Sequence, residues 1–183
     1  MSRLIHLNGP PGIGKSTLAR RYVADHPGVL DCDIDVLRTL IGGWESDFQG
    51  AGALIRPAAL AMIEAYLVNG PDVVLPQMLI DPAELARFEA CASGAGAQFV
   101  ERMLMDTRAA SVARFHRRGE SETGDQWHHQ VRTIVAANGG DDELARCHAA
   151  LEHLARQRPD AVVIPSAEGA VEETYHFLVA SLG

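Results

Sequence analysis

Residues 9–16 constrain the fold more than any other part of the chain. They read Gly9-Pro10-Pro11-Gly12-Ile13-Gly14-Lys15-Ser16 and fit the pattern G-x-x-x-x-G-K-[ST] in full. In this pattern glycines let backbone N–H groups turn inward around phosphates, and the helix that follows presents its N-terminus to the anion. The lysine reaches the β- and γ-phosphates and the serine hydroxyl holds Mg²⁺. We therefore expect a site for ATP and Mg²⁺ here, with Lys15 catalytic, Ser16 as the metal ligand and Thr17 supporting the same region.

Lysine usage strengthens this expectation. Lys15 is the only lysine among the sixteen Lys and Arg residues of the chain. Arginine serves wherever a positive charge alone is needed, but its planar fork does not replace a compact ammonium on a flexible stem. The presence of a single lysine therefore indicates that Lys15 has a specific role in the phosphate loop.

Apolar runs alternate with helical patterns along the whole chain. This alternation predicts an α/β fold with a parallel sheet, covered on both faces and connected by right-handed crossovers. We expect strands at residues 4–7, 29–33, 73–75, 98–105 and 161–164. We expect helices at residues 16–24, 35–41, 57–68, 81–92, from 107 to before 119, 125–137, 141–156 and 168–182, with a loop at 42–53 and a polar stretch at 119–124. No linker or repeat divides residues 1–183, so we expect a single domain with a helical lid inserted at about 115–140.

Composition narrows the location and the partners. The net charge of -8 argues against a broad basic groove for a long nucleic acid. The three cysteines are widely spaced and include no Cys-x-x-Cys pair, which is typical of reduced core thiols. The start shows no signal-peptide pattern, and no apolar run approaches the roughly 18 residues of a membrane span. We expect a cytoplasmic protein with no membrane partner.

Two classes of phosphate-loop protein fit the sequence poorly. A guanine-reading Asn-Lys-x-Asp motif requires a second lysine, which the chain lacks. A motor or oligomeric ATPase usually has an apolar strand that ends in Asp, whereas Val73-Val74-Leu75 is followed by Pro76-Gln77.

Carboxylates follow the second predicted strand in the order Asp31-Cys32-Asp33-Ile34-Asp35. The C-terminal ends of parallel strands meet at one edge of the sheet, where the phosphate loop also lies. A carboxylate there can accept the proton of an attacking hydroxyl, so Asp33 and Asp35 are the candidate catalytic bases. For each of them a plain helix cap is the alternative, and Asp31 is the weakest candidate.

Residues 9–17 and the segment Asp35-Val36-Leu37-Arg38 resemble the small P-loop kinases, which include the polynucleotide 5′-kinase, gluconate kinase and chloramphenicol phosphotransferase groups. The resemblance implies the P-loop NTPase fold, a three-layer α/β/α sandwich with a five-stranded parallel sheet and a helical lid. It also implies that Asp35 is the general base and that Arg38 contacts the acceptor or an anionic group on it. Asp33 is the competing base.

Arginines in the predicted lid suit phosphoryl transfer. Arg114 and Arg118 are four residues apart on one helical face, and Arg117 is also eligible. Lid arginines neutralise the charge that develops on the transferred group, so Arg114 and Arg118 are candidate catalytic residues; a solvated face is the alternative. By resemblance, residues 165–169 pack the adenine, although no side chain there can be singled out.

The acceptor pocket is expected to draw on residues 42–56, on Gln77 and Met78 after the third strand, and on the lid. Trp44 is either a stacking surface or a core anchor, and Arg56 meets an anionic substrate group or lies at the surface. Gln77 can hydrogen-bond acceptor hydroxyls. His128 and His129 are adjacent on a helix and face different ways, so a metal pair is not expected.

These patterns predict a phosphotransferase that moves the γ-phosphate of Mg-ATP to a hydroxyl of a small molecule, a metabolite or an antibiotic. The alternatives are a nucleotide or polynucleotide 5′-hydroxyl kinase and an ATP-binding regulatory module with slow hydrolysis. The sequence identifies neither the acceptor nor the oligomeric state, because pocket residues in loops converge only in space.

Overall fold

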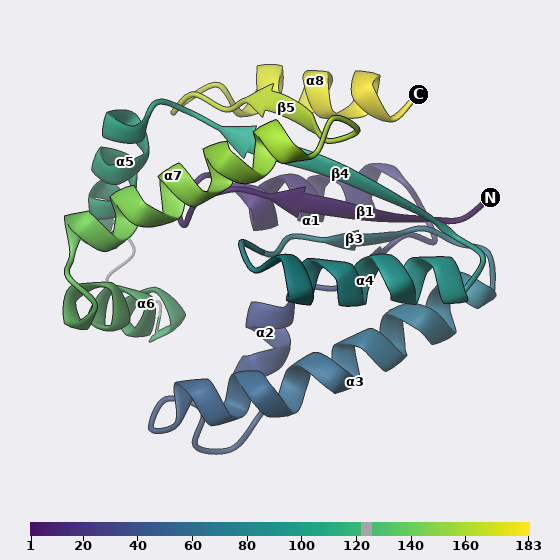
Figure 1. Cartoon of the computed structure of the whole chain (residues 1–183), viewed down its shortest axis with the longest axis horizontal. Coiled ribbons are helices and arrows are strands. Elements are labelled where there is room, and N and C mark those ends of the chain that lie inside the picture. Colours follow the sequence, from purple (N-terminus) through teal and green to yellow (C-terminus); the bar gives the residue numbers. More distant parts are fainter. Residues whose placement is uncertain (122–125) are drawn as a thin grey trace. The chain divides into compact units, whose positions relative to one another are not determined.

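The computed structural model describes residues 1–121 and 126–183 (Figure 1). The strands are β1 (Arg3–Asn8), β2 (Leu30–Asp31), β3 (Val73–Leu75), β4 (Gln98–Met105) and β5 (Val162–Pro165). The helices are α1 (Lys15–Asp25), α2 (Ile34–Thr39), α3 (Phe48–Val68), α4 (Pro82–Gly94), α5 (Arg108–Ser121), α6 (Gln126–Ala137), α7 (Asp141–Gln157) and α8 (Val171–Leu182). The strands form a five-stranded sheet in the order β2-β3-β1-β4-β5. This confirms the predicted α/β class, a P-loop NTPase fold built on a parallel sheet.

The chain divides into two compact units, and each is described here by itself. The first unit comprises residues 1–7 and 16–101, and the second comprises residues 8–15 and 102–183. The phosphate loop up to Lys15 therefore belongs to the second unit, whereas the candidate bases belong to the first.

In the first unit, β3 pairs in parallel with both β1 and β2. All three residues of β3 are buried, as are Leu4, Ile5 and Leu7 of β1. A run this uniformly apolar is typical of a strand covered on both faces. In the same unit, Asp81 caps α4 by accepting the N–H of Ala83 at 2.8 Å, with Pro82 as the first helical residue, as predicted.

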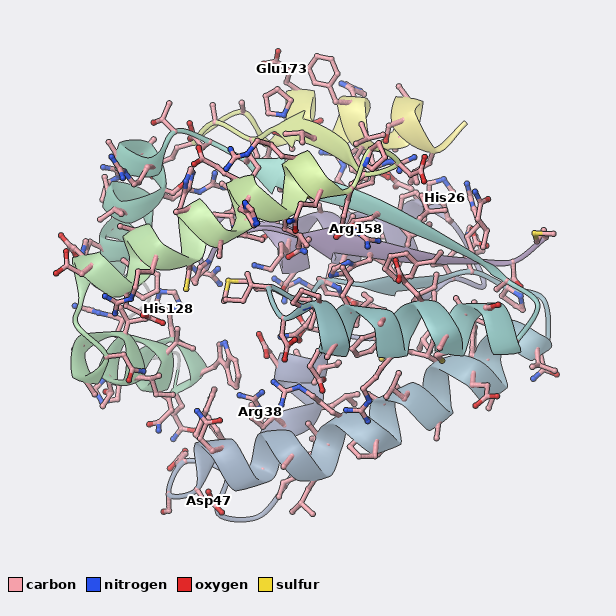
Figure 2. All side chains as sticks on the ribbon, viewed as in Figure 1. His26, Arg38, Asp47, His128, Arg158 and Glu173 are labelled. Atoms are coloured by element: carbon pink, nitrogen blue, oxygen red, sulfur yellow. The ribbon has the colours of Figure 1, made fainter. Side chains whose placement is uncertain are left out.

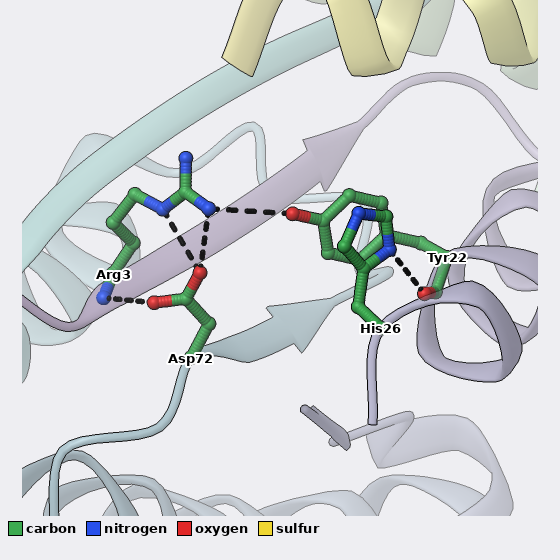
Figure 3. A network of polar contacts seen from close by, with 4 residues as sticks. All are labelled: Arg3, Tyr22, His26 and Asp72. Carbon is green, nitrogen blue, oxygen red and sulfur yellow. Dashed lines mark hydrogen bonds and ion pairs between the residues drawn. The ribbon is translucent and has the colours of Figure 1, made fainter. Parts of the chain in front are cut away.

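A polar network ties three elements of the first unit together (Figure 3). Arg3, at the start of β1, donates from its backbone N–H and its guanidinium to the carboxylate of Asp72, just before β3. The guanidinium also donates to the hydroxyl of Tyr22 on α1, whose ring stacks on His26. The hydrogen bond to Asp72 raises the pKa of Arg3. The network fixes the start of β1 against α1 and the loop before β3.

In the second unit, β4 pairs in parallel with β5. Helices α5, α6 and α7 pack on one another around Phe115, Val135 and Leu144, with Val112 and Val131 against that cluster. These helices include the part of the predicted lid, 115–140, that the structure describes; residues 122–125 of that prediction lie outside the described residues. The expectations of a single domain and of lid closure remain predictions.

Several predicted boundaries are wrong, and for three of them the structure shows the reason. The second strand is shorter than 29–33, because Asp33 already caps α2. Helix α3 begins at Phe48 and not at Pro57, because Asp47 caps it by accepting the N–H of Gly50 at 2.8 Å. Pro57 therefore lies inside the helix, where it removes one backbone hydrogen bond. Helix α5 continues past Gly119, since one glycine costs a helix only about 1 kcal/mol.

Helix α3 also corrects the expectation that no apolar run approaches the length of a membrane span. An 18-residue window within it has a mean hydropathy of 1.4, so the helix is long and apolar enough to cross a membrane by length and composition alone. Only 28% of that window is buried, and the buried residues of the helix are Ala51, Gly52, Ala59, Ile63 and Leu67. Core helices pass the same test, so one such helix is weak evidence for a membrane.

Candidate nucleotide site and acceptor residues

The phosphate loop of the second unit is shaped by glycines that no other residue replaces. Gly9 has a φ of 148°, and a Cβ at this position would lie 2.5 Å from the carbonyl oxygen of Leu104 on β4. Gly14 has a φ of 105°, which L-residues with side chains rarely adopt. The close approach to β4 and the left-handed backbone therefore require glycine at these two predicted positions.

The lysine of the motif lies across its own loop. Lys15 Nζ donates to the carbonyl oxygens of Gly9 at 2.9 Å and Pro10 at 3.0 Å. Lys15 is also the first residue of α1, so the ammonium and the N-terminal end of the helix lie at the same loop. Both favour an anion at this place.

Arg114 of α5 is the predicted lid arginine that reaches the phosphate loop. Its Nη1 donates to the carbonyl oxygen of Ser166 at 3.0 Å, and its Nη2 lies 3.2 Å from the position that a Cβ on Gly14 would occupy. Burial lowers the pKa of Arg114, against the opposing charges of Glu168 and Asp106. A partly desolvated guanidinium beside a phosphate loop is well placed to meet a phosphoryl oxygen.

The two other lid arginines differ from Arg114. Arg117 is exposed and donates to both carboxylate oxygens of Glu168, which follows β5. Its hydrogen bond lowers the pKa of Glu168. Arg118 is half-buried, and its charge helps to lower the pKa of Arg114, so the two guanidinium groups share one neighbourhood.

Ser166 and Glu168 lie in the segment 165–169, which the resemblance assigned to adenine packing without singling out a side chain. Ser166 is buried, and its Oγ donates to the carbonyl oxygen of Ile13 in the phosphate loop at 3.2 Å. The only available signal was the position of the segment after the fifth strand, which cannot reveal contacts 153 residues apart.

Of the adjacent histidines on α6, only His128 is packed inside the protein. His128 is buried, with its ring tilted against Phe115 at 5.8 Å between centroids, while His129 is exposed. Nε2 of His148 lies 2.9 Å from the carbonyl oxygen of Asp106. Across the described ranges, no group of three or more His, Cys, Asp or Glu side chains could hold a metal ion.

In the first unit, the structure separates the two candidate bases. Asp33 caps α2, and its Oδ1 accepts the backbone N–H groups of Asp35 and Val36 at 3.0 and 3.4 Å. Asp35 is half-buried in the first turn of α2. Burial, and then the charge of Asp33, raise the pKa of Asp31 to about 6. Asp33 thus caps α2, and the choice between Asp33 and Asp35 as the base remains a prediction.

Arg38 is held in the packing of α2 on α3 (Figure 2). Its guanidinium lies 4.0 Å from the centroid of the Phe48 ring and 3.1 Å from the place of a Cβ on Gly52. Burial lowers its pKa, while the charge of Asp35 raises it and that of Arg56 lowers it. Arg38 is therefore packed against α3, and the charges of Asp35 and Arg56 act on its guanidinium.

The three remaining candidates for binding the acceptor also lie in the first unit. Arg56 Nε lies 3.8 Å from Glu84 Oε2 on α4, in a half-exposed ion pair. Trp44 is buried, which favours the core-anchor alternative over a stacking surface. Gln77 is buried after β3, and its carbonyl oxygen lies 2.8 Å from His6 Nε2. Roles in binding the acceptor remain predictions for all three.

The residues of the phosphate loop fit ATP and Mg²⁺. Gly14 leaves the space that a Cβ would fill, Lys15 supplies an ammonium, and α1 presents its N-terminal end. Ser16, the second residue of α1, supplies the hydroxyl that the motif assigns to Mg²⁺. The ammonium and the helix N-terminus suit the phosphates of a nucleoside triphosphate, and the hydroxyl suits its metal ion.

Comparison with known proteins agrees with the fold. The family model described as AAA domain matches residues 4–137. Among solved structures, a gluconokinase from Sinorhizobium meliloti 1021 is similar at 18% identity and a TM-score of 0.59, covering 98% of this chain and 94% of that one. A deoxyadenosine kinase from M. mycoides is similar at 12% identity and a TM-score of 0.55, covering 98% and 97%. At these identities the likeness is one of fold. No curated protein matches the chain in sequence.

Proposed function

Because this chain belongs to the AAA domain family and has the fold of the small P-loop kinases, we propose that it transfers the γ-phosphate of Mg-ATP to a hydroxyl of a small molecule. The observation that carries the proposal is the phosphate loop, with Lys15 Nζ on two loop carbonyls and Arg114 beside Gly14. Such a loop binds and orients a triphosphate, and orientation with charge stabilisation supplies most of the catalysis in phosphoryl transfer.

The proposal gives each candidate residue a role. Backbone N–H groups of residues 9–16 and the ammonium of Lys15 bind the phosphates, with Thr17 supporting the loop. Asp35 takes the proton of the acceptor hydroxyl, whose oxygen bonds to the γ-phosphorus while the bond to the bridging oxygen breaks and ADP leaves. Arg114 and Arg118 stabilise the charge on the transferred group. Mg²⁺, held by Ser16, neutralises phosphate charge when it is bound.

A small, uncharged or singly charged acceptor suits the first unit better than a polymer. The chain carries a net charge of -8, which disfavours a long phosphate backbone. Trp44 and Arg38 are buried, so they offer an acceptor little aromatic or cationic surface. We propose a cytoplasmic enzyme, since its three cysteines form no disulfide.

A nucleoside or nucleotide acceptor is the second candidate. It is favoured by the charges around Arg38: burial lowers the pKa of Arg38, the charge of Asp35 raises it, and the charge of Arg56 lowers it further. An anionic group between two such cations would relieve that opposition. A deoxyadenosine kinase is also among the proteins of similar fold.

The decisive experiment measures ADP release from Mg-ATP in the presence of pooled acceptors. The pools are sugars, nucleosides, nucleotides, short oligonucleotides and hydroxylated antibiotics. We expect one pool to raise ADP release well above the water background and to yield a matching phosphorylated product, and we expect Lys15→Ala to abolish the increase. Arg20→Ala, an exposed change on the same helix, is the matched control and should retain it.

The result also separates the rivals. Phosphorylation confined to nucleosides or nucleotides would select the second candidate. Tight ATP binding with no stimulation by any pool would contradict a kinase and would favour an ATP-binding regulatory module.

A further inference from the structure

Ser166, the residue after β5, uses all of its polar groups within the second unit. Its N–H donates to the carbonyl oxygen of Met105 at 2.8 Å, at the end of β4. Its carbonyl oxygen accepts from Arg114 Nη1 at 3.0 Å, and its hydroxyl donates to the carbonyl oxygen of Ile13 at 3.2 Å. One buried serine, 3% exposed, thereby joins the end of the sheet, the lid arginine and the phosphate loop.

The hydrogen bond from the Ser166 hydroxyl to the Ile13 carbonyl oxygen also affects the direction of the Gly14 N–H. The carbonyl of Ile13 and the N–H of Gly14 belong to one planar trans peptide, in which they point in opposite directions. When Ser166 holds the carbonyl on its own side, the Gly14 N–H is turned away from Ser166. Gly14 has a φ of 105° and no Cβ, so its backbone has little steric preference of its own and depends on such a contact.

We propose that Ser166 is a positioning residue of the phosphate site: its hydroxyl fixes the Ile13–Gly14 peptide so that the Gly14 N–H faces the bound phosphate. The role rests on the proposed binding of ATP by the loop. Ser166 itself touches no phosphate in this scheme. It sets the direction of one donor in advance, so that binding does not have to order that peptide.

The same serine couples the arginine to the loop. The guanidinium of Arg114 lies between the Ser166 carbonyl oxygen and Gly14. A shift of Ser166 would therefore move the loop carbonyl and the arginine together. We expect one substitution there to weaken the binding of phosphates and not that of the acceptor.

The test measures dissociation constants of Mg-ATP and of inorganic tripolyphosphate by calorimetry for a series at one position. Ser166→Ala removes the donor, and we expect both constants to rise about three- to tenfold, as for the loss of one hydrogen bond. Ser166→Cys keeps a weaker donor, and its constants should fall between those of the other two proteins. Equal losses for ATP and tripolyphosphate would place the effect at the phosphates and not at the adenine ring.

Ser111→Ala is the matched control. Ser111 lies on α5 in the same unit and is also buried, and within the described part of the chain its hydroxyl has no hydrogen-bond partner. We expect this variant to bind both probes as the unaltered chain does. The Gly14 amide in ¹H–¹⁵N spectra of the ligand-free proteins supplies a second readout, and it should shift in Ser166→Ala and stay in place in Ser111→Ala.

The outcomes separate this inference from the proposed function. If the unaltered chain binds both probes and Ser166→Ala binds them equally well with an unmoved Gly14 amide, the positioning role is wrong and the proposed function stands. If the unaltered chain binds neither probe, both are wrong. If Ser166→Ala weakens the binding of Mg-ATP but not that of tripolyphosphate, Ser166 supports the binding of adenine, and the proposal that it positions Gly14 is wrong.

Discussion

The phosphate loop and the acceptor-side residues are held in different ways. In the second unit, the loop is fixed by contacts to the backbone: Lys15 on two loop carbonyls, Ser166 on Ile13 and Gly9 against β4. In the first unit, the candidate residues are fixed through side chains, with Arg38 on Phe48 and Arg56 near Glu84. Backbone contacts follow from glycine positions and tolerate many neighbouring side chains, whereas side-chain packing depends on each partner.

This difference explains why the sequence predicts the nucleotide and does not predict the acceptor. A site made of N–H groups and one ammonium recognises any polyphosphate, and its residues are contiguous in the sequence. A site made of convergent side chains takes its residues from helices and turns that are distant in sequence. Substitutions in the first unit should therefore alter acceptor chemistry and stability, and those in the second should alter nucleotide affinity.

The largest effect is expected at the base. Asp35→Asn should lower phosphoryl transfer by about 10³-fold, because the acceptor hydroxyl loses its proton acceptor, while the dissociation constant of Mg-ATP stays the same. Asp33→Asn should change transfer only slightly, since Asn caps a helix nearly as well as Asp. Single-turnover rates with a confirmed acceptor measure both. A large loss in Asp33→Asn with little in Asp35→Asn would exchange the two roles.

The second effect concerns the lid arginines. Arg114→Gln should lower transfer by about 10²-fold, because this guanidinium lies beside Gly14. Arg117→Gln is the matched control on the same helix, and it should have a far smaller effect because its exposed side chain is paired with Glu168. Steady-state rates at saturating acceptor make the comparison. A greater loss in Arg118→Gln than in Arg114→Gln would move the catalytic role along the helix.

The sequence predicted the fold and the phosphate loop because both are encoded locally. Alternating apolar runs gave β3 and β4 at their observed bounds, and the motif located Gly9, Gly14 and Lys15. The start of α3 was missed because Asp47, as a cap, outweighed the usual place of Pro57 in a first turn. The turn that holds Trp44 and the helix that follows it were read as one polar loop.

What the sequence could not show are contacts between distant segments. Ser166 and Ile13 are 153 residues apart, and neither has a composition that marks it. Burial of Trp44 and the stacking of Arg38 on Phe48 depend on how α2 meets α3, which no periodicity in the sequence specifies. The predicted candidates of the acceptor side were therefore plausible residue types whose contacts only the structure gives.

The third effect tests whether Arg38 serves packing. Arg38→Ala should lower the free energy of unfolding by about 2 kcal/mol, because the stem loses its packing and the guanidinium its stacking on Phe48. Arg56→Ala, which breaks a half-exposed ion pair, should cost less than about 0.5 kcal/mol. Urea denaturation measures both. Unchanged stability in Arg38→Ala, together with a raised KM for an anionic acceptor, would instead make Arg38 an acceptor contact.

The smallest effect is a pH dependence of stability in the first unit. Burial, followed by the charge of Asp33, raises the pKa of Asp31 from 3.8 to about 6 in the folded chain, against the opposing charge of Arg20. Between about pH 4 and pH 6 the folded chain therefore binds more protons than the unfolded chain, and stability must fall as the pH rises through this window. A fully buried group with this shift would lose about 3 kcal/mol, but Asp31 is partly exposed and screening reduces the loss to about 1 kcal/mol.

Asp31→Asn removes the titrating group and isolates its effect. Above about pH 7 the variant should be more stable than the unaltered chain by about 1 kcal/mol, because no charge is desolvated, and below about pH 4 the advantage should vanish. Thermal unfolding across this range measures the difference, with the exposed Asp160→Asn as the control. An advantage that persists unchanged at low pH would show that side-chain volume, and not the buried charge, sets the stability at Asp31. In that case burial of the charge would not be what distinguishes Asp31 from the exposed carboxylates of the first unit.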